Sequence, residues 1–133
     1  MADLTIRRIP FSKDADNRMR TLKGRTGITP NFLCRLGFCL SLEESGIPES
    51  YTKLVDQGRD INRFTLLGEF DIAFVSLLKV WMKDKKLNTG ESDEIDSYFI
   101  AHMNRGVELI SCAVQCECCF QLVQCLVFKG SCA

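Results

Sequence analysis

The distribution of charge along the first 44 residues is the feature that most constrains the fold. Residues 1–35 contain eight Lys or Arg and three acidic residues, a net charge of +5, and the rest of the chain carries −5. The same segment reads as a short strand (Leu4–Ile9), a basic helix, a Thr-Gly break and a second, apolar helix. This basic strand–helix–helix indicates a partner that carries phosphate, such as a nucleic acid.

The strand needs a partner, because a lone short strand is not stable in water. We expect it to pair either with a second copy of the chain or with residues around 63–66. Pro10 then removes a backbone donor, and Ser12 is suited to cap a helix over Lys13–Arg25. Apolar residues recur at i, i+4 and i+7 in that helix and predict one narrow buried face.

Two glycines, Gly24 and Gly27, lie beside the basic face of this helix. Gly27 is placed for the C-terminal cap, and we expect the pair to set the helix junction and to let the backbone approach a phosphate. Thr29 and Pro30 begin the second helix, which is predicted to end near Glu44.

The rest of the chain predicts a loop and two long helices. Residues 45–60 read as a loop between a basic unit (1–44) and a helical packing unit (61–111), both within one domain that spans 1–111. A third helix is expected from Leu67 or Glu69 to Lys83, and ten of the thirteen residues 70–82 are apolar. A helix this apolar is covered on more than one side, so we expect subunits to pack together. A fourth helix, or two consecutive ones, should begin near Ser92, which makes the fold class mainly α and oligomeric.

No catalytic motif is present. The sequence lacks the phosphate-binding, dinucleotide-binding, nucleophile-elbow and zinc-protease signatures. Its one histidine, His102, lies on a periodic helix stripe and is predicted to be a packed or interface residue. We therefore expect no enzyme activity and no cofactor.

The cysteines are unevenly placed. Cys34 and Cys39 lie in the apolar second helix, and the other six are Cys112, Cys116, Cys118, Cys119, Cys125 and Cys132. Three of these share one helix face, which suits a four-ligand zinc site poorly, so we predict no metal and leave the tail 112–133 without a role. The absence of a secretion signal and of a membrane-spanning stretch predicts reduced thiols and a cytoplasmic location.

The basic residues could also form an ordinary solvent-exposed helix face that binds no ligand. Asp14 and Arg18, and likewise Asp16 and Arg20, are spaced to form i, i+4 ion pairs. Arg7, Arg8, Lys23 and Arg25 have no acidic residue close by in the sequence, and the net charge of this segment exceeds what solubility requires. We therefore predict seven residues that contact DNA phosphate: Arg7, Arg8, Lys13, Arg18, Arg20, Lys23 and Arg25.

Four stretches of the chain, in order, carry a resemblance to a known family: 18–36, 40–44, 61–71 and 102–109. They resemble DndE, the small protein of the bacterial DNA sulfur-modification (phosphorothioation) system. The resemblance implies a ribbon-helix-helix-like N-terminus, a homotetramer and binding of nicked double-stranded DNA through surface basic residues. It also implies other sulfur-modification proteins as partners that perform the sulfur chemistry.

The expected function is thus that of a DNA-binding accessory subunit for phosphorothioation. Two alternatives remain open: a ribbon-helix-helix transcription regulator that binds a specific operator, and a scaffold for partner proteins that does not bind DNA. The jobs of Arg63 and Arg105 are also open; burial against a carboxylate such as Glu69 and DNA contact are both compatible with the sequence.

Overall fold

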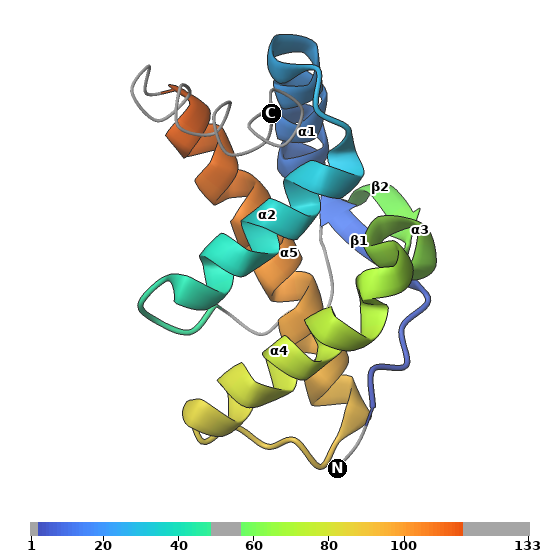
Figure 1. Cartoon of the computed structure of the whole chain (residues 1–133), viewed down its shortest axis with the longest axis vertical. Helices are drawn as coiled ribbons and strands as arrows, with labels where there is room; N and C mark the ends of the chain where they lie inside the picture. Colours follow the sequence, from blue (N-terminus) through green and yellow to red (C-terminus); the bar gives the residue numbers. More distant parts are fainter. Residues whose placement is uncertain (1–2, 49–56, 116–133) are drawn as a thin grey trace, which may run out of the picture.

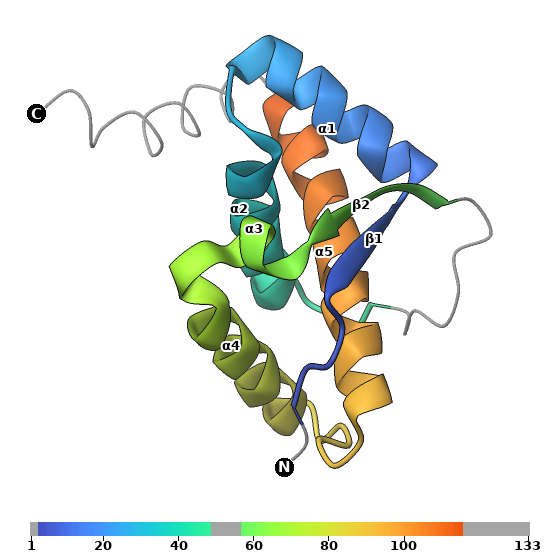
Figure 2. The same ribbon diagram turned by 90° about the vertical axis from the view of Figure 1, so that its right-hand side faces the viewer.

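A long helix, α5 (Ser92–Gln115), is the axis against which three other helices and one strand pack (Figure 1). The computed structural model describes residues 3–48 and 57–115. Before α5, the elements in chain order are β1 (Arg8–Ser12), α1 (Lys13–Thr26), α2 (Pro30–Glu43), β2 (Gln57–Asn62), α3 (Arg63–Leu67), the short 3-10 helix η1 (Gly68–Phe70) and α4 (Asp71–Asp84). The fold is mainly helical, with one small antiparallel ribbon of two strands beside α5 (Figure 2).

The ribbon forms within one chain. β1 pairs antiparallel with β2, and Ile9 lies opposite Ile61. The predicted strand was misplaced, because it begins at Arg8 and not at Leu4, and residues 57–60 belong to a strand and not to the expected loop. Residues 63–66 form α3 instead, since the Asn62 side chain accepts hydrogen bonds from the next backbone amides and caps a helix there.

Side chains, and not a second strand, bind the backbone of residues 4–6. Arg63 Nη1 donates to the carbonyl oxygens of Leu4 and Ile6 at 3.0 and 3.1 Å. Asp96 accepts from the amide nitrogen of Thr5 at 2.9 Å. These bonds satisfy polar groups that a ladder would otherwise satisfy, which explains why the strand starts later than its sequence pattern suggests.

The two N-terminal helices follow their local signals. α1 begins at Lys13 because Ser12 Oγ accepts a hydrogen bond from the Ala15 amide at 3.0 Å. It ends at Gly27, whose φ of 72° is left-handed and whose amide donates to the Lys23 carbonyl. α2 begins at Pro30 and ends one residue before the predicted end.

The C-terminal helices differ from prediction at their ends. α4 starts at Asp71, because Gly68, with φ of 57°, interrupts the helix that α3 began. The described part of α5 is one continuous helix, so it includes Cys112 from the predicted tail. Residues 116–133, with Cys116, Cys118, Cys119, Cys125 and Cys132, lie outside the described residues.

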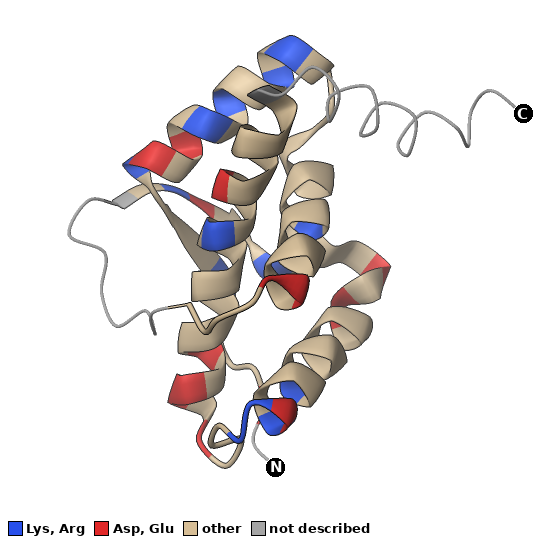
Figure 3. Cartoon of the chain, turned by 90° about the vertical axis from the view of Figure 1, so that its left-hand side faces the viewer, with Lys and Arg blue, Asp and Glu red and all other residues tan. Residues whose placement is uncertain are grey.

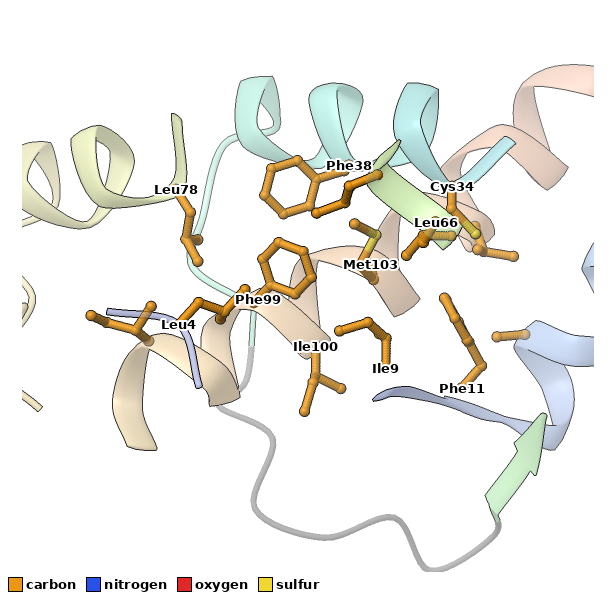
Figure 4. Packing of buried hydrophobic residues seen from close by; sticks show 14 of the residues in the cluster. Leu4, Ile9, Phe11, Cys34, Phe38, Leu66, Leu78, Phe99, Ile100 and Met103 are labelled. Carbon is orange, nitrogen blue, oxygen red and sulfur yellow. The ribbon is translucent and has the colours of Figure 1, made fainter. Parts of the chain in front are cut away.

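The buried core joins both halves of the sequence. Ile9 and Phe11 of β1 pack with Phe38 of α2 and with Phe99 and Met103 of α5 (Figure 4). The rings of Phe38 and Phe99 are tilted, with centroids 5.2 Å apart. The strand and α2 therefore depend on α5 for their burial.

The α2–α5 contact is the most extensive between any two elements, and two glycines make it close. A Cβ added at Gly37 would lie 2.6 Å from backbone atoms of Gly106, and one added at Gly106 would overlap the backbone of Gly37. The helices thus approach with backbone against backbone at this point. Any side chain here would push α2 away from α5.

Candidate nucleic-acid interface

The exposed side of α1 carries most of the predicted DNA-contact residues. Ala15, Met19 and Leu22 are buried, as the spacing predicted, and this burial turns the basic residues outward. Figure 3 shows basic positions along α1 at one end of the molecule and acidic positions at the start of α5 toward the other end. The two ends differ in charge, although the first turn of α1 carries Asp14 and Asp16 and the last turn of α4 carries Lys83.

Two of the predicted ion pairs form on α1. Arg18 Nε lies 2.8 Å from Asp14 Oδ2, and Arg20 Nη2 lies 3.2 Å from Asp16 Oδ2. Arg18 also donates from Nη1 to the hydroxyl of Ser111 on α5 at 3.1 Å. Arg18 thus connects α1 to α5 and is half-buried, which leaves it less free to contact a ligand than its position in the sequence suggests.

Arg8 has an acidic partner that the sequence did not reveal. Its guanidinium makes two hydrogen bonds to Asp60 across the ribbon, at 2.9 and 3.0 Å. The interaction lowers the pKa of the Asp60 carboxyl below its usual range. Because Asp60 is 52 residues away, only the pairing of β1 with β2 brings the two side chains together.

Four of the seven predicted cations remain without an ion pair among the described residues. These are Arg7, Lys13, Lys23 and Arg25, and all are exposed. Lys23 and Arg25 lie in the last turn of α1, where the helix dipole favours positive charge. They form the part of this face with the most freely available positive charge.

The two glycines beside the face differ in their surroundings. Gly27 adopts the left-handed conformation of a helix cap. Gly24 lies inside α1, and a Cβ added there would meet no atom within 4 Å. The turn into α2 therefore depends directly on Gly27, whereas Gly24 leaves the helix surface without a side chain.

Arg59 of β2 joins this face, and sequence reasoning missed it. Its Nε lies 3.3 Å from Asp16 Oδ1, so Asp16 lies between the guanidinium groups of Arg20 and Arg59. Nothing in the spacing of residues 16 and 59 signals this contact, because β2 was expected to be a loop.

Arg63 and Arg105, whose jobs the sequence left open, both bind within the fold. Arg63 makes two hydrogen bonds to Asp71, at 2.7 and 3.0 Å, so its carboxylate partner is Asp71 and not Glu69. Arg105 donates to the backbone oxygen and the hydroxyl of Ser41. Neither guanidinium is part of the exposed basic face.

His102 is fully buried, and its Nδ1 lies 2.7 Å from Ser41 Oγ. Burial, together with the positive charge of Arg105, lowers the pKa of His102 to about 3, so the ring is neutral near pH 7. A serine beside a histidine resembles part of a catalytic pair, but Ser41 Oγ also accepts a hydrogen bond from Arg105 and has no exposed surface. The arrangement stabilises packing between α2 and α5.

The cysteines that the structure describes, Cys34, Cys39 and Cys112, are free thiols. Cys34 is buried, and burial raises the pKa of its thiol to about 12. Across residues 3–48 and 57–115, no three His, Cys, Asp or Glu side chains are grouped as metal ligands would be. In the same part of the chain, no helix is both long and apolar enough to span a bilayer.

A second surface is apolar. On α4, Ile72 is 80% exposed and Val80 is 67% exposed. A groove of about 310 Å³ lies next to this helix, between α2 and α4, and its lining includes Phe32, Phe70 and Phe74. Exposed apolar patches mark contacts with proteins or membranes, ligand-binding grooves or aggregation-prone surfaces.

These features define a class: a small, mainly helical protein with an N-terminal ribbon and an exposed basic helix. A sequence profile of the family described as "DNA sulphur modification protein DndE" matches residues 8–117. This match spans most of the sequence, so the chain belongs to the DndE family.

Solved structures of this family have the same fold. The crystal structure of DndE from Escherichia coli, involved in DNA phosphorothioation modification, is 29% identical with a TM-score of 0.65, and the match covers 82% of this chain and 99% of that one. A mutant DndE involved in DNA phosphorothioation is 24% identical with a TM-score of 0.58, over 80% of this chain and 97% of that one, and this likeness concerns the fold alone. No curated protein matches the sequence.

Proposed function

We propose that this protein is a DNA-binding accessory subunit of the DNA phosphorothioation machinery. The observation that carries the proposal is the set of exposed cations on and before α1 that lack an ion pair among the described residues, above all Lys23 and Arg25. Exposed Lys and Arg side chains bind duplex DNA chiefly by neutralising phosphates and releasing counterions. The proposed ligand is therefore the backbone of double-stranded DNA in the bacterial cytoplasm.

Sequence-specific reading through the ribbon is disfavoured by the contacts of its side chains. In a ribbon-helix-helix regulator, strand side chains enter the major groove and read base edges. Here the Thr5 hydroxyl is bound to Asp96, and Arg8 is bound to Asp60. Arg7 is exposed and has no ion pair among the described residues, but a single free side chain is too little to read a base sequence. We therefore propose little preference for any base sequence.

A preference for nicked duplex is the finer part of the proposal, and the family resemblance motivates it. A nick removes one covalent connection of the backbone, so a duplex bends there at lower cost. A short helix such as α1 then contacts phosphates on both sides of the break. We propose that partner proteins carry out the sulfur chemistry, as the family resemblance implies. The Ser41–His102 pair has no exposed surface that a substrate could reach.

Self-association is proposed through the apolar face of α4 and the neighbouring groove. The exposed Ile72 and Val80 belong to a helix that the fold covers on one side only. A homotetramer would cover this face and would present several copies of α1 to one DNA molecule. Several weak backbone contacts, combined in one assembly, raise the overall affinity.

The test is binding to matched intact, nicked and palindrome-containing duplexes over a series of salt concentrations. Wild type is compared with a Lys23→Glu/Arg25→Glu double mutant, and Lys83→Glu/Lys85→Glu, at the far end of α4, is the charge-matched control. We expect preference for the nick, a steep loss of affinity with salt, and loss of binding in the first mutant only.

Other results would support one of the two alternative functions, a transcription regulator or a scaffold. Strong preference for the palindrome over random DNA indicates a transcription regulator. DNA affinity that is equal in wild type and in Lys23→Glu/Arg25→Glu, with loss of a complex with sulfur-modification proteins in that mutant, indicates a scaffold.

A further inference from the structure

Asp16 is a buried carboxylate shared by two arginines from different elements. Its side chain is 11% exposed, whereas those of Arg20 and Arg59 are 65% and 37% exposed. Arg20 comes from the second turn of α1, and Arg59 comes from β2. The carboxylate thus lies beneath two guanidinium groups that both reach solvent.

Gly58 makes this arrangement possible. A Cβ at Gly58 would lie 3.0 Å from the Cβ of Asp16 and 3.0 Å from the carbonyl oxygen of Ser12, distances tighter than ordinary packing. Glycine therefore lets β2 pass close to the start of α1, and Figure 2 shows the two side by side. The next residue, Arg59, therefore lies beside α1, although the two are far apart in the sequence.

The guanidinium groups of Arg20 and Arg59 donate few of their N–H groups to Asp16. A guanidinium has five N–H donors. Arg20 gives a single hydrogen bond from Nη2, and the Arg59 contact is an ion pair without hydrogen-bond geometry, so Asp16 Oδ1 accepts no hydrogen bond from the residues that the structure describes. Two positive charges against one negative charge leave the group with a net charge of +1.

We propose that Arg20 and Arg59 together form a clamp for one DNA phosphate and that Asp16 is the positioning residue that holds them. Guanidinium groups bind phosphate oxygens with directed hydrogen bonds, and a fixed pair loses less conformational entropy on binding than two free side chains. This inference rests on the proposed DNA binding and adds Arg59, a residue outside the basic helix, to the interface.

The experiment measures affinity for the nicked duplex against salt for Arg20→Gln, Arg59→Gln and the double variant. The control is Lys85→Gln, which also removes one exposed positive charge but lies at the far end of α4. We expect each arginine variant to lower affinity about three- to tenfold, and the slope of log affinity against log salt to fall by about 0.9 in the double variant, because one phosphate contact is lost.

Several results would overturn the clamp. The first is an Arg59→Gln variant with the same DNA affinity as Lys85→Gln. The second is a double variant whose salt slope changes by the amount expected for two phosphate contacts, because the two arginines then bind separate phosphates. Failure of the wild type itself to bind duplex DNA would instead refute the proposed function. Thermal melting of each variant verifies that it is folded.

The role of Asp16 is tested by a variant that removes its negative charge. Asp16→Asn raises the net charge of the face, so a purely electrostatic surface would bind DNA more tightly. The clamp requires the opposite, since the two guanidinium groups lose the group that holds them. Weaker binding by folded Asp16→Asn supports the positioning role, and unchanged or tighter binding refutes it.

Discussion

The imidazole of His102 on α5 and the hydroxyl of Ser41 on α2 share a hydrogen bond of 2.7 Å in a site closed to solvent. Arg105 donates to the same hydroxyl, so Ser41 Oγ links the imidazole to a guanidinium group. The rings of His102 and Trp81 are nearly perpendicular, with centroids 4.2 Å apart. His102 thus joins α2, α4 and α5. The sequence predicted that it is either a packed residue or an interface residue.

The first prediction concerns acid stability. The pKa of His102 is about 3 in the folded protein against 6.5 for a free histidine, so below about pH 6.5 the unfolded chain binds a proton that the folded chain does not. Stability therefore falls as pH falls, by about 2 kcal/mol between about pH 7.5 and about pH 5.

Chemical denaturation at several pH values measures this loss. His102 is the only histidine in the chain, so His102→Gln should remove most of the slope in that range, above the range in which carboxylates titrate. An equal slope in wild type and variant would show that His102 is not the group responsible.

The second prediction concerns the crossing of α2 and α5. Gly106→Ala places a methyl group on the backbone of Gly37, so the helices must separate. We expect a loss of about 2 kcal/mol or more, visible as a lower melting temperature.

Gly24→Ala is the matched control for that variant. Gly24 lies inside a helix with open space around it, so alanine should leave stability unchanged or raise it by up to about 1 kcal/mol. If the two variants melt at the same temperature, the close crossing is not needed for stability.

The third prediction concerns the junction of α1 and α2. Gly27 has a φ of 72°, a conformation that costs a β-branched residue about 1–2 kcal/mol or more. Gly27→Val should lower the melting temperature, and Gly27→Asn should lower it less, because asparagine tolerates the left-handed region. An unchanged melting temperature in Gly27→Val would count against the cap.

The fourth prediction concerns self-association. Ile72→Glu and Val80→Glu place a charge on the exposed apolar face of α4, and burial of that charge in an interface is costly. Sedimentation should show dissociation to monomers with unchanged helical circular dichroism. Lys83→Glu, on the same helix, is the control, and an unchanged mass in all three variants would place the interface elsewhere.

Local signals in the sequence were enough to predict α1 and α2. Ser12, Gly27 and Pro30 act within one helical turn, and the apolar residues of α1 recur with the helix period. For the same reason the Asp14–Arg18 and Asp16–Arg20 pairs were predictable, since residues four apart meet on any helix. These features do not depend on the rest of the chain.

The strand pairing, the Arg8–Asp60 bond and the position of Arg59 were decided by tertiary structure. Each joins residues more than 40 positions apart in the sequence, so no local pattern signals them. The strand begins at Arg8 because side chains of Arg63 and Asp96 satisfy the backbone before it. The sequence by itself thus determined α1, α2 and the sign of the basic face, because their signals act within a few residues. The strand pairing and the packing on α5 decided which of the charges on that face are free to contact a ligand.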